Sequence, residues 1–422
     1  MTARSVLLIN RVLPPAPGAS GRLLADLARH LAQAGWRVTV LVDQGPGPAA
    51  IRDGTAAERD GMPDIAVVVT GGAAGPGRAA SAGVRAYAAA GWRLLRAALR
   101  LPPHDLVITM TDPPLLALLA SVLRRLRGGE TLHWVQDLYP DLLPVLGRPL
   151  PQPLSRLAGR IMRAALADQG AVLCIGPCMA ARLCRAGVPA SRITVVPNWP
   201  QDALRSAQPD PIRLAALLGR RPPGLVALYA GTLGLAHPVE ILGEAAWRLA
   251  RSHPQITLLV VGAGRQADRL VEVVARHRLD NLRLLAPLPE ADIASLSASA
   301  DLHIALMREG AAGLMLPCKV GAALGAGRPV LFCGPAESGA ARMLRDSGAG
   351  LVLPPTGGAL AAALGRLADE PAALARLQRQ ARAARQGWTR AEAVDRIGRL
   401  AAGVVGGVQP VDSAVLGMAG PA

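Results

Sequence analysis

Short apolar segments that alternate with helix-forming segments constrain the fold of this chain more than any other feature. The clearest series lies in the second half, at residues 256–261, 281–286, 301–306 and 329–332. Each segment runs into a loop rich in glycine or proline, and a helical pattern follows most of them. Parallel strands that are buried on both faces have this rhythm. It predicts an α/β sheet with a ligand crevice along the carboxyl ends of its strands.

The first half of the chain repeats the pattern. Its predicted strands cover residues 6–10, 37–42, 65–69, 106–110, 131–139, 170–175 and 193–198. Residues 204–224 lose the rhythm and collect prolines, as an interdomain linker does, and the strand at 225–230 opens the second series. We therefore predict two Rossmann-like, doubly wound domains, 1–203 and 204–402, that face each other across a cleft. The last helix of the second domain packs back on the first, and 403–422 form a disordered tail.

Composition narrows the possible partners. The 422 residues are half apolar, which suits two globular cores, and the net charge is +16. Arginine supplies almost all of the positive charge, since Lys319 is the only lysine. We find no helix-turn-helix, zinc-finger or RNP-like pattern and few aromatic residues, which argues against a nucleic acid partner. An anionic membrane surface or a polyphosphate ligand fits the charge better.

One segment favours contact with a membrane. Residues 83–100 form a basic amphipathic helix with Trp92 at the boundary of its two faces, a pattern typical of helices that lie on bilayers. The simpler alternative is a surface helix that packs its Leu/Ala face on its own domain. No apolar run is long enough to cross a bilayer, and the N-terminus has no signal-peptide layout. We therefore expect a cytoplasmic protein, peripheral on the inner face of the membrane.

The cysteines do not indicate a metal. All five lack the paired spacing of a zinc site, so we expect reduced, buried thiols and no metal ligands.

Several segments resemble a known enzyme family, and their order and spacing carry the resemblance. They are residues 7–18, 179–189, 193–199, 229–234 and 326–330. The chain resembles the GT-B glycosyltransferases of family 4, in the branch that builds bacterial surface polysaccharides and O-antigens. The resemblance implies transfer of a hexosyl or N-acetylhexosaminyl group from a nucleotide-sugar donor, UDP-linked, to a lipid-linked or saccharide acceptor. Retention of configuration is implied, without a metal or cofactor. The second domain would bind the donor and the first the acceptor.

The donor diphosphate needs backbone N–H groups and a cation. Gly231 and Thr232 follow a strand and allow close approach of the backbone, although a plain strand-to-helix turn would look the same. Relatives place arginine and lysine around this loop, where this chain has Thr232 and His237. Lys319, after Pro317 at a predicted helix start, is our candidate for the missing cation; a solvated lysine is the alternative. The crevice loops add four more donor-site candidates, Gly262, Gly264, Pro287 and Leu316.

One departure from the family is clear. The glutamate that typically binds the ribose hydroxyls has Ala322 in its place, which cannot accept a hydrogen bond through its side chain. Glu309 lies in the neighbourhood of the family's first glutamate. Glu337 is a candidate substitute, although an exposed loop glutamate is the simpler interpretation.

The acceptor side supplies the candidate catalytic groups. Asp137 ends the predicted strand at 131–139, where a carboxylate could take the proton of the acceptor hydroxyl or stabilise positive charge on the sugar ring. His133 is the second candidate, although a lone strand histidine is more often structural.

Two further loops complete the expected acceptor site. Asp112 lies at the end of another strand. Gly18, Ser20 and Gly21 resemble the acceptor-side glycine loop of the family, where a lipid diphosphate could rest; tight packing on the sheet is the alternative. Ser20 is also a plausible N-cap for the first helix.

Two other functions share this architecture. A UDP-sugar 2-epimerase would need its own set of catalytic carboxylates and a histidine in the nucleotide domain, a pattern that we do not find. A catalytically silent GT-B protein that binds a nucleotide sugar as an assembly partner stays open because of Ala322.

Overall fold

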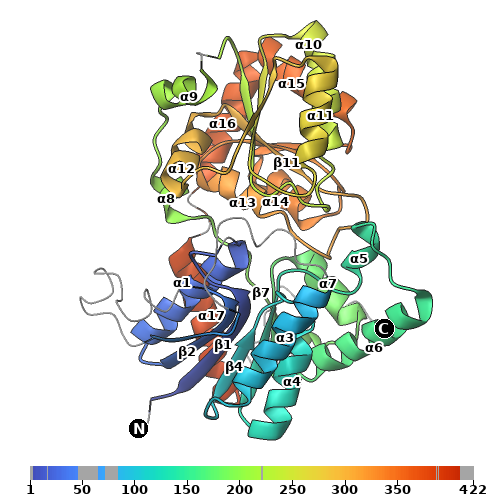
Figure 1. Cartoon of the computed structure of the whole chain (residues 1–422). Helices are drawn as coiled ribbons and strands as arrows, with labels where there is room; N and C mark the ends of the chain where they lie inside the picture. The colour runs from blue at the N-terminus through green and yellow to red at the C-terminus, as the bar shows by residue number, and fades with distance from the viewer. Residues whose placement is uncertain are drawn as a thin grey trace.

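Two α/β domains lie one above the other in the computed structural model (Figure 1). The structure describes residues 3–16, 18–45, 65–71, 84–219, 222–385, 387 and 389–408. Each domain has a central parallel sheet with helices on both faces, so the predicted fold class is confirmed. No helix formed by the described residues is both long enough and apolar enough to span a bilayer.

The sheet of the first domain has, within the described residues, seven parallel strands in the order β3-β2-β1-β4-β5-β6-β7. They are β1 (Ser5–Val12), β2 (Arg37–Gln44), β3 (Ile65–Val69), β4 (Leu106–Thr109), β5 (Glu130–Val135), β6 (Ala171–Cys174) and β7 (Ile193–Val195). The strand order reverses between β1 and β4. Their carboxyl ends therefore form the switch point at which doubly wound sheets bind ligands.

Helices of the first domain cover both faces of this sheet. They are α1 (Ala19–Gln33), α3 (Val84–Ala98), α4 (Leu116–Arg127), α5 (Leu142–Val145), α6 (Gln152–Ala167) and α7 (Pro177–Arg185). Helix α3 buries Leu94 and Ala98 in the core beside β1 and β4, whereas Trp92 remains 65% exposed. The Leu/Ala face of the basic helix thus packs on its own domain.

The second sheet has six parallel strands among the described residues, in the order β10-β9-β8-β11-β12-β13. They are β8 (Val226–Ala230), β9 (Thr257–Val261), β10 (Leu282–Leu285), β11 (Leu302–Leu306), β12 (Val330–Cys333) and β13 (Gly350–Leu353). Its helices are α10 (Glu240–Ser252), α11 (Ala267–His277), α12 (Glu290–Ser299), α13 (Cys318–Gly325), α14 (Gly339–Ser347), α15 (Gly357–Asp369) and α16 (Pro371–Ala384). The switch point lies here between β8 and β11.

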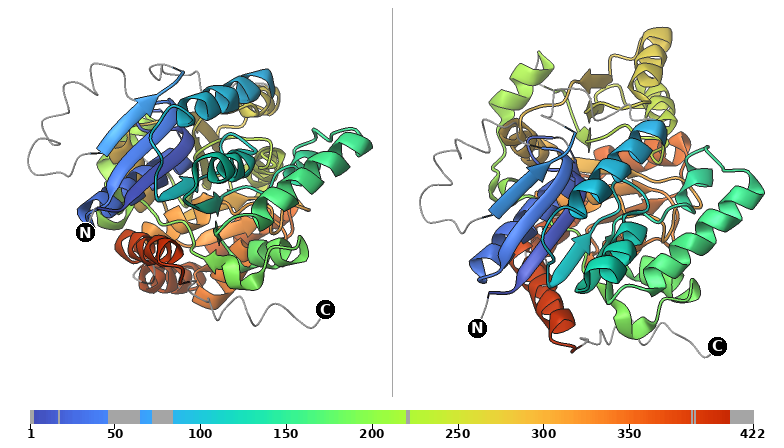
Figure 2. Two further views of the ribbon diagram at one scale, coloured as in Figure 1. Left: turned by 90° about the horizontal axis from the view of Figure 1, so that it is seen from below. Right: turned by 60° about the horizontal axis from the view of Figure 1, so that its bottom comes forward.

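The chain crosses between the domains twice. It first passes through residues 198–202, where the indole N–H of Trp199 donates to Asp26 of α1 at 2.8 Å. It returns between α16 and the last helix, α17 (Arg390–Val405), which packs against α1 and β5. Arg390 pairs with Asp202 at 2.8 Å and reaches Asp26 at 3.6 Å. In Figure 1, α17 lies beside α1 in the lower domain, and in Figure 2 it stays on the same side as the N-terminal strands.

Several predicted boundaries differ from the structure; β7, for example, ends at Val195 and not at residue 198. Strand β5 ends at Val135, four residues early, so that Asp137 lies in a loop. The proline-rich segment 204–224 contains α8 (Asp202–Ser206) and α9 (Pro211–Leu218), because Pro211 occupies the first turn of α9, where its missing N–H needs no partner. Helix α17 continues to Val405, past the predicted end at 402. Of the predicted tail, residues 409–422 lie outside the described residues.

Candidate functional site

The carboxyl edges of the two sheets meet at one junction. The N–H of Leu138, after β5, donates to the carbonyl of Leu314 in the loop between β11 and α13 at 2.8 Å. Arg182 of α7 donates to the carbonyl of Ala312 in the same loop at 2.9 Å. The loop after β5 in the first domain is thus bonded to the segment that leads into Lys319.

Glycines at the end of β9 shape the loops at the carboxyl edge of the second sheet. A Cβ on Gly262 would lie 2.1 Å from the carbonyl oxygen of Gly231, and one on Gly264 would lie 2.4 Å from that of Leu233. The N–H of Leu233 donates to Ala263 at 3.0 Å. These two glycines therefore allow the loop after β9 to lie directly on the loop after β8, and their contacts are with protein backbone.

Lys319 lies under the two loops that follow β8 and β9. Its ammonium donates to the carbonyl of Thr232 at 3.3 Å, lies 3.5 Å from Nε2 of His237, and is 4.9 Å from the centroid of the Tyr229 ring. The side chain is buried, and burial lowers the pKa of its ammonium. A Cβ on Gly231 would lie 3.3 Å from Cε of Lys319, and the backbone φ of +120° at Gly231 favours glycine there.

His237 is held in one tautomer. Its Nδ1–H donates to the carbonyl of Leu306 at 2.7 Å, so the Nε2 lone pair faces Lys319. Burial, with the charge of Lys319, lowers the pKa of His237 to about 3. The imidazole therefore adds no positive charge beside Lys319 near neutral pH.

Sequence reasoning missed two members of this cluster. Tyr229 forms its floor, and Arg308, two residues after β11, donates to the carbonyl of Leu235 at 2.7 Å and lies 3.5 Å from Glu240. The position of Arg308 directly after the strand at the switch point was the signal that could have found it.

Other donor-side candidates lie apart from this cluster. Pro287 is exposed after the edge strand β10, and Leu316 is half-buried, packed among apolar residues of both domains. Neither touches the Lys319 cluster in the described contacts. Ala322 packs in a small apolar cluster with Leu204 of α8, while Glu309 and Glu337 are exposed. The expectation of buried thiols holds for Cys174 and Cys333, whereas Cys178 and Cys184 are half-buried and Cys318, at the start of α13, is exposed.

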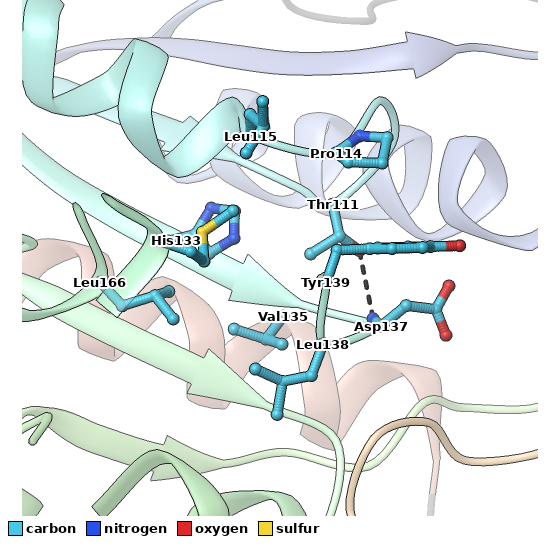
Figure 3. Close-up of a pocket in the computed structure, with 10 residues that line it drawn as sticks. Thr111, Pro114, Leu115, His133, Val135, Asp137, Leu138, Tyr139 and Leu166 are labelled. Atoms are coloured by element: carbon cyan, nitrogen blue, oxygen red, sulfur yellow. Dashed lines mark hydrogen bonds between the residues drawn. The ribbon is translucent and has the colours of Figure 1, made fainter. Parts of the chain in front are cut away.

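Asp137 lies on the first-domain side of the junction (Figure 3). Its backbone N–H and that of Gln136 donate to Oγ1 of Thr111 at 3.2 and 3.3 Å, which fixes the loop after β5. Burial, and next the charge of Asp112, raises the pKa of the Asp137 carboxyl to about 6. This carboxylate makes no hydrogen bond to the described residues and in Figure 3 points away from His133. It is therefore free to receive a proton near neutral pH.

His133 is a buried strand residue. Its Nδ1 lies 2.8 Å from Oγ1 of Thr109, and burial lowers its pKa to about 3. It lines a small pocket with Asp137, Thr111, Pro114, Leu115, Val135, Leu138, Tyr139, Met162 and Leu166. The structure thus brings His133 and Asp137 to one pocket but gives them different environments: an uncharged ring in the wall and a titratable carboxyl at the mouth.

Asp112 is held by an ion pair at the first switch point. Arg11 Nε donates to its Oδ1 at 2.7 Å, and the guanidinium lies 5.3 Å from the ring centroid of Tyr87. Burial raises the pKa of Tyr87, and the charge of Arg265 in the second domain acts against this rise. Arg11, Tyr87 and Arg265 were not predicted.

The glycine loop before α1 is close to the sheet, and the N-cap prediction for Ser20 is wrong. Gly18 caps α1 without a side-chain hydrogen bond, and Ser20 lies in the first turn. The reason is Asn10, whose Nδ2 donates to the Ser20 hydroxyl at 3.3 Å and to the carbonyl of Val12 at 2.9 Å. A Cβ on Gly21 would lie 2.8 Å from the same carbonyl, so α1 starts against β1.

No group of three or more His, Cys, Asp or Glu side chains in the described part of the chain is placed to hold a metal ion.

Family models match both domains. Residues 18–199 match a glycosyl transferase 4-like domain, and residues 224–370 match the glycosyl transferases group 1. Among curated relatives, WcaI of Escherichia coli K12, described as a colanic acid biosynthesis glycosyl transferase, is 29% identical over 47% of this chain and 50% of its own. The chain thus spans about half the length of this relative.

Solved structures share the fold over nearly the whole chain. HepE of Anabaena, in complex with UDP and glucose, has a TM-score of 0.67 at 18% identity and covers 94% of this chain and 98% of its own. Sucrose-phosphate synthase of Thermosynechococcus elongatus has a TM-score of 0.72 at 18% identity over 96% of this chain and 100% of its own. A UDP-N-acetylglucosamine 2-epimerase also matches, at 16% identity and TM-score 0.56, over 94% of this chain and 95% of its own, so the fold alone does not select a reaction. The domain matches do select a family: the chain belongs to the GT-B glycosyltransferases of family 4, with a glycosyl transferase 4-like first domain and a group 1 second domain.

Proposed function

We propose that this chain moves a hexosyl or N-acetylhexosaminyl group from a UDP-linked donor to a lipid-linked or saccharide acceptor at the inner face of a bacterial membrane. The relative WcaI supports a place in surface polysaccharide synthesis, and the bound UDP and glucose of HepE support the donor class. Family resemblance supports retention of the anomeric configuration.

The observation that carries the proposal is the junction between the domains. The hydrogen bond from Leu138 to Leu314 ties the loop of Asp137 to the segment that enters α13 with Lys319. One domain thus contributes a titratable carboxyl and the other a buried cation under a glycine loop. Transfer with retention needs both groups at one face of the sugar, the cation at the departing diphosphate and the carboxylate at the acceptor hydroxyl.

The chemistry follows from their charges. The bond between the anomeric carbon and the diphosphate oxygen breaks, and the acceptor oxygen bonds to that carbon. Lys319 and the N–H groups of the loop at Gly231 balance the negative charge that stays on UDP. Asp137 takes the acceptor proton or stabilises positive charge on the sugar ring. We propose that neither a metal nor a cofactor takes part, since Lys319 supplies the positive charge at the phosphates.

Purified protein with a panel of UDP-sugars and a polyprenyl-diphosphate sugar acceptor tests the proposal. We expect acceptor-dependent release of UDP that survives EDTA, and a product whose anomeric proton coupling in NMR reports retention. Conversion of the donor at C2 without an acceptor would instead identify an epimerase. Binding of the donor, seen as a thermal shift, without turnover for any acceptor would identify a silent assembly partner.

A further inference from the structure

Helices α4 and α6 present an apolar surface to solvent. Helix α6 exposes Leu154, Leu157 and Ile161 by 50, 54 and 40%, and the start of α4 adds its N-cap residue Leu115 and Leu118 at 48 and 38%. We call these five residues the α4–α6 face. The three on α6 follow an i, i+3, i+7 spacing and share one side of the helix. A row of large aliphatic side chains in water marks an interaction surface more often than chance exposure.

The two helices form one unit. The hydroxyl of Ser121 on α4 donates to the carbonyl of Ala165 on α6 at 3.5 Å, and the amide of Gln169 donates to Ser121, Ala165 and Ala117. Figures 1 and 2 show α6 at the outer edge of the first domain, across the sheet from α17. The apolar row therefore projects outward on a rigid support.

Charge on these helices selects the partner. Their 28 residues (12 in α4 and 16 in α6) contain six arginines and no aspartate or glutamate. The arginines are Arg124, Arg125 and Arg127 on α4 and Arg156, Arg160 and Arg163 on α6. On α6 no salt bridge joins them to a described carboxylate. A symmetric dimer through this face would set arginines against arginines, whereas anionic lipid headgroups would pair with them.

We propose that the α4–α6 face docks the first domain on a bilayer that contains anionic lipid. Leu154, Leu157 and Ile161 enter the boundary between headgroups and acyl chains, and Arg156, Arg160 and Arg163 on the neighbouring flank of α6 bind the phosphates. Helix α3 does not take this role, because its leucines are buried in its own domain.

The same helices lead to the candidate acceptor site. Leu115 lines a pocket together with Met162 and Leu166 from the inner side of α6, and the other end of that pocket is Asp137 (Figure 3). This step rests on the proposed function. A lipid-linked acceptor would then leave the bilayer beside α6, with its reacting end close to Asp137.

Vesicle binding of the full chain tests the docking surface without any need for transfer activity. We expect co-sedimentation with vesicles of phosphatidylcholine and phosphatidylglycerol and much less with phosphatidylcholine alone. Leu157→Gln with Ile161→Gln should weaken this binding at least about tenfold, since two aliphatic side chains are withdrawn from the bilayer. Arg156→Gln with Arg160→Gln and Arg163→Gln should abolish the preference for phosphatidylglycerol.

Matched exposed positions serve as controls. Ile212→Gln with Val271→Gln in the second domain, 83 and 53% exposed, and Trp92→Gln on α3 should leave vesicle binding unchanged. The thermal shift with UDP should be the same in every variant, which separates loss of docking from failure of the donor site or of folding. Equal vesicle binding by the α6 variant and the control, or no binding by the parent chain, would overturn the proposal. So would a dimer in light scattering that only the α6 substitutions dissociate, since it would assign the face to a second copy.

Discussion

The ammonium nitrogen of Lys319 lies 3.5 Å from Nε2 of His237, and the neutral state of that imidazole lets a buried cation stay there. The carbonyl of Leu306 fixes the proton on Nδ1, so a lone pair faces the ammonium. A pKa of about 3 keeps His237 uncharged throughout the physiological range. The single lysine of this chain is thus buried against a neutral imidazole, a carbonyl oxygen and an aromatic ring.

Lys319→Met should weaken UDP binding by about 10- to 100-fold, since a charge-assisted hydrogen bond contributes roughly 1.5–3 kcal/mol. The free energy of unfolding should stay the same or rise, because the substitution removes a desolvated ammonium. Calorimetric titration with UDP measures the first and urea denaturation the second. Arg276→Met, at an exposed position of α11, is the control and should change neither. Unchanged UDP affinity in Lys319→Met would remove this residue from the donor site.

Gly262→Ala should destabilise the second domain by more than about 2 kcal/mol, because its Cβ would lie 2.1 Å from a backbone oxygen that cannot move away alone. Gly91→Ala in α3 has open space around the new methyl group and should instead stabilise by up to about 1 kcal/mol. Urea denaturation of both variants gives the comparison. A neutral Gly262→Ala would show that the two loops do not lie on each other in solution.

Asp137→Asn should abolish transfer and leave UDP binding intact, since the donor cluster lies on the other domain. In the parent chain, transfer should fall as the pH drops through about 6, where the Asp137 carboxylate becomes protonated. Titration of His133 should not change the transfer rate near neutral pH, since its pKa is about 3. A pH–rate profile checks both statements, and full activity of Asp137→Asn would exclude the carboxylate from the reaction.

The raised pKa of Asp137 also predicts a pH-dependent stability. The folded state holds this proton more tightly than the unfolded state, so the contribution of Asp137 to stability is lost as the pH rises from about 4 to about 6. Asp137→Asn should therefore raise the melting temperature at pH 7.5 relative to the parent chain, and the difference should shrink at pH 4. Differential scanning fluorimetry at the two pH values measures this, and a difference of the opposite sign would contradict the buried carboxylate.

Trp199→Phe should lower the free energy of unfolding by about 1–3 kcal/mol, because it removes the indole N–H that donates to the buried Asp26 carboxylate at 2.8 Å. The ring would still pack on Trp134, whose centroid lies 5.7 Å away. Trp92→Phe, at a largely exposed position, is the matched control and should have no measurable effect. Equal urea midpoints for the two variants would mean that the bond to Asp26 contributes nothing.

Sequence patterns were sufficient for the sheets because both are parallel and buried. Strands β8 and β12 are uninterrupted apolar runs, and β9 and β11 each contain a single polar residue, so the sequence alone is enough to identify these four strands. The end of β5 could not be predicted from the sequence. The hydroxyl of Thr111, 26 residues away, accepts a hydrogen bond from the backbone N–H of Asp137 and turns the chain out of the sheet. The N-cap prediction for Ser20 was wrong for a similar reason, since the side-chain amide of Asn10 donates a hydrogen bond to the Ser20 hydroxyl.

The candidate site was predictable only in part. Lys319 stood out as the single lysine after a proline, and Asp137 as a carboxylate beyond an apolar run. The partners that define their environments come from distant segments: Lys319 and His237 are 82 residues apart, and Arg11 and Asp112 are 101 apart. Spacing in one sequence does not encode such pairs, so the roles of Tyr229 and Arg11 became visible only in the fold.

The double crossing of the chain also decides how the cleft can move. Two covalent connections, one at Trp199 and one ahead of Arg390, lie close together because both side chains meet Asp26. Bodies joined at two neighbouring points can rotate about one axis but cannot twist independently. A single rotation about this axis would break or restore the contact of Leu138 with Leu314. The same rotation would change the distance from Asp137 to Lys319. The motion that admits a donor would then be the same motion that brings the reacting groups together. Water would therefore be excluded only when both substrates are present.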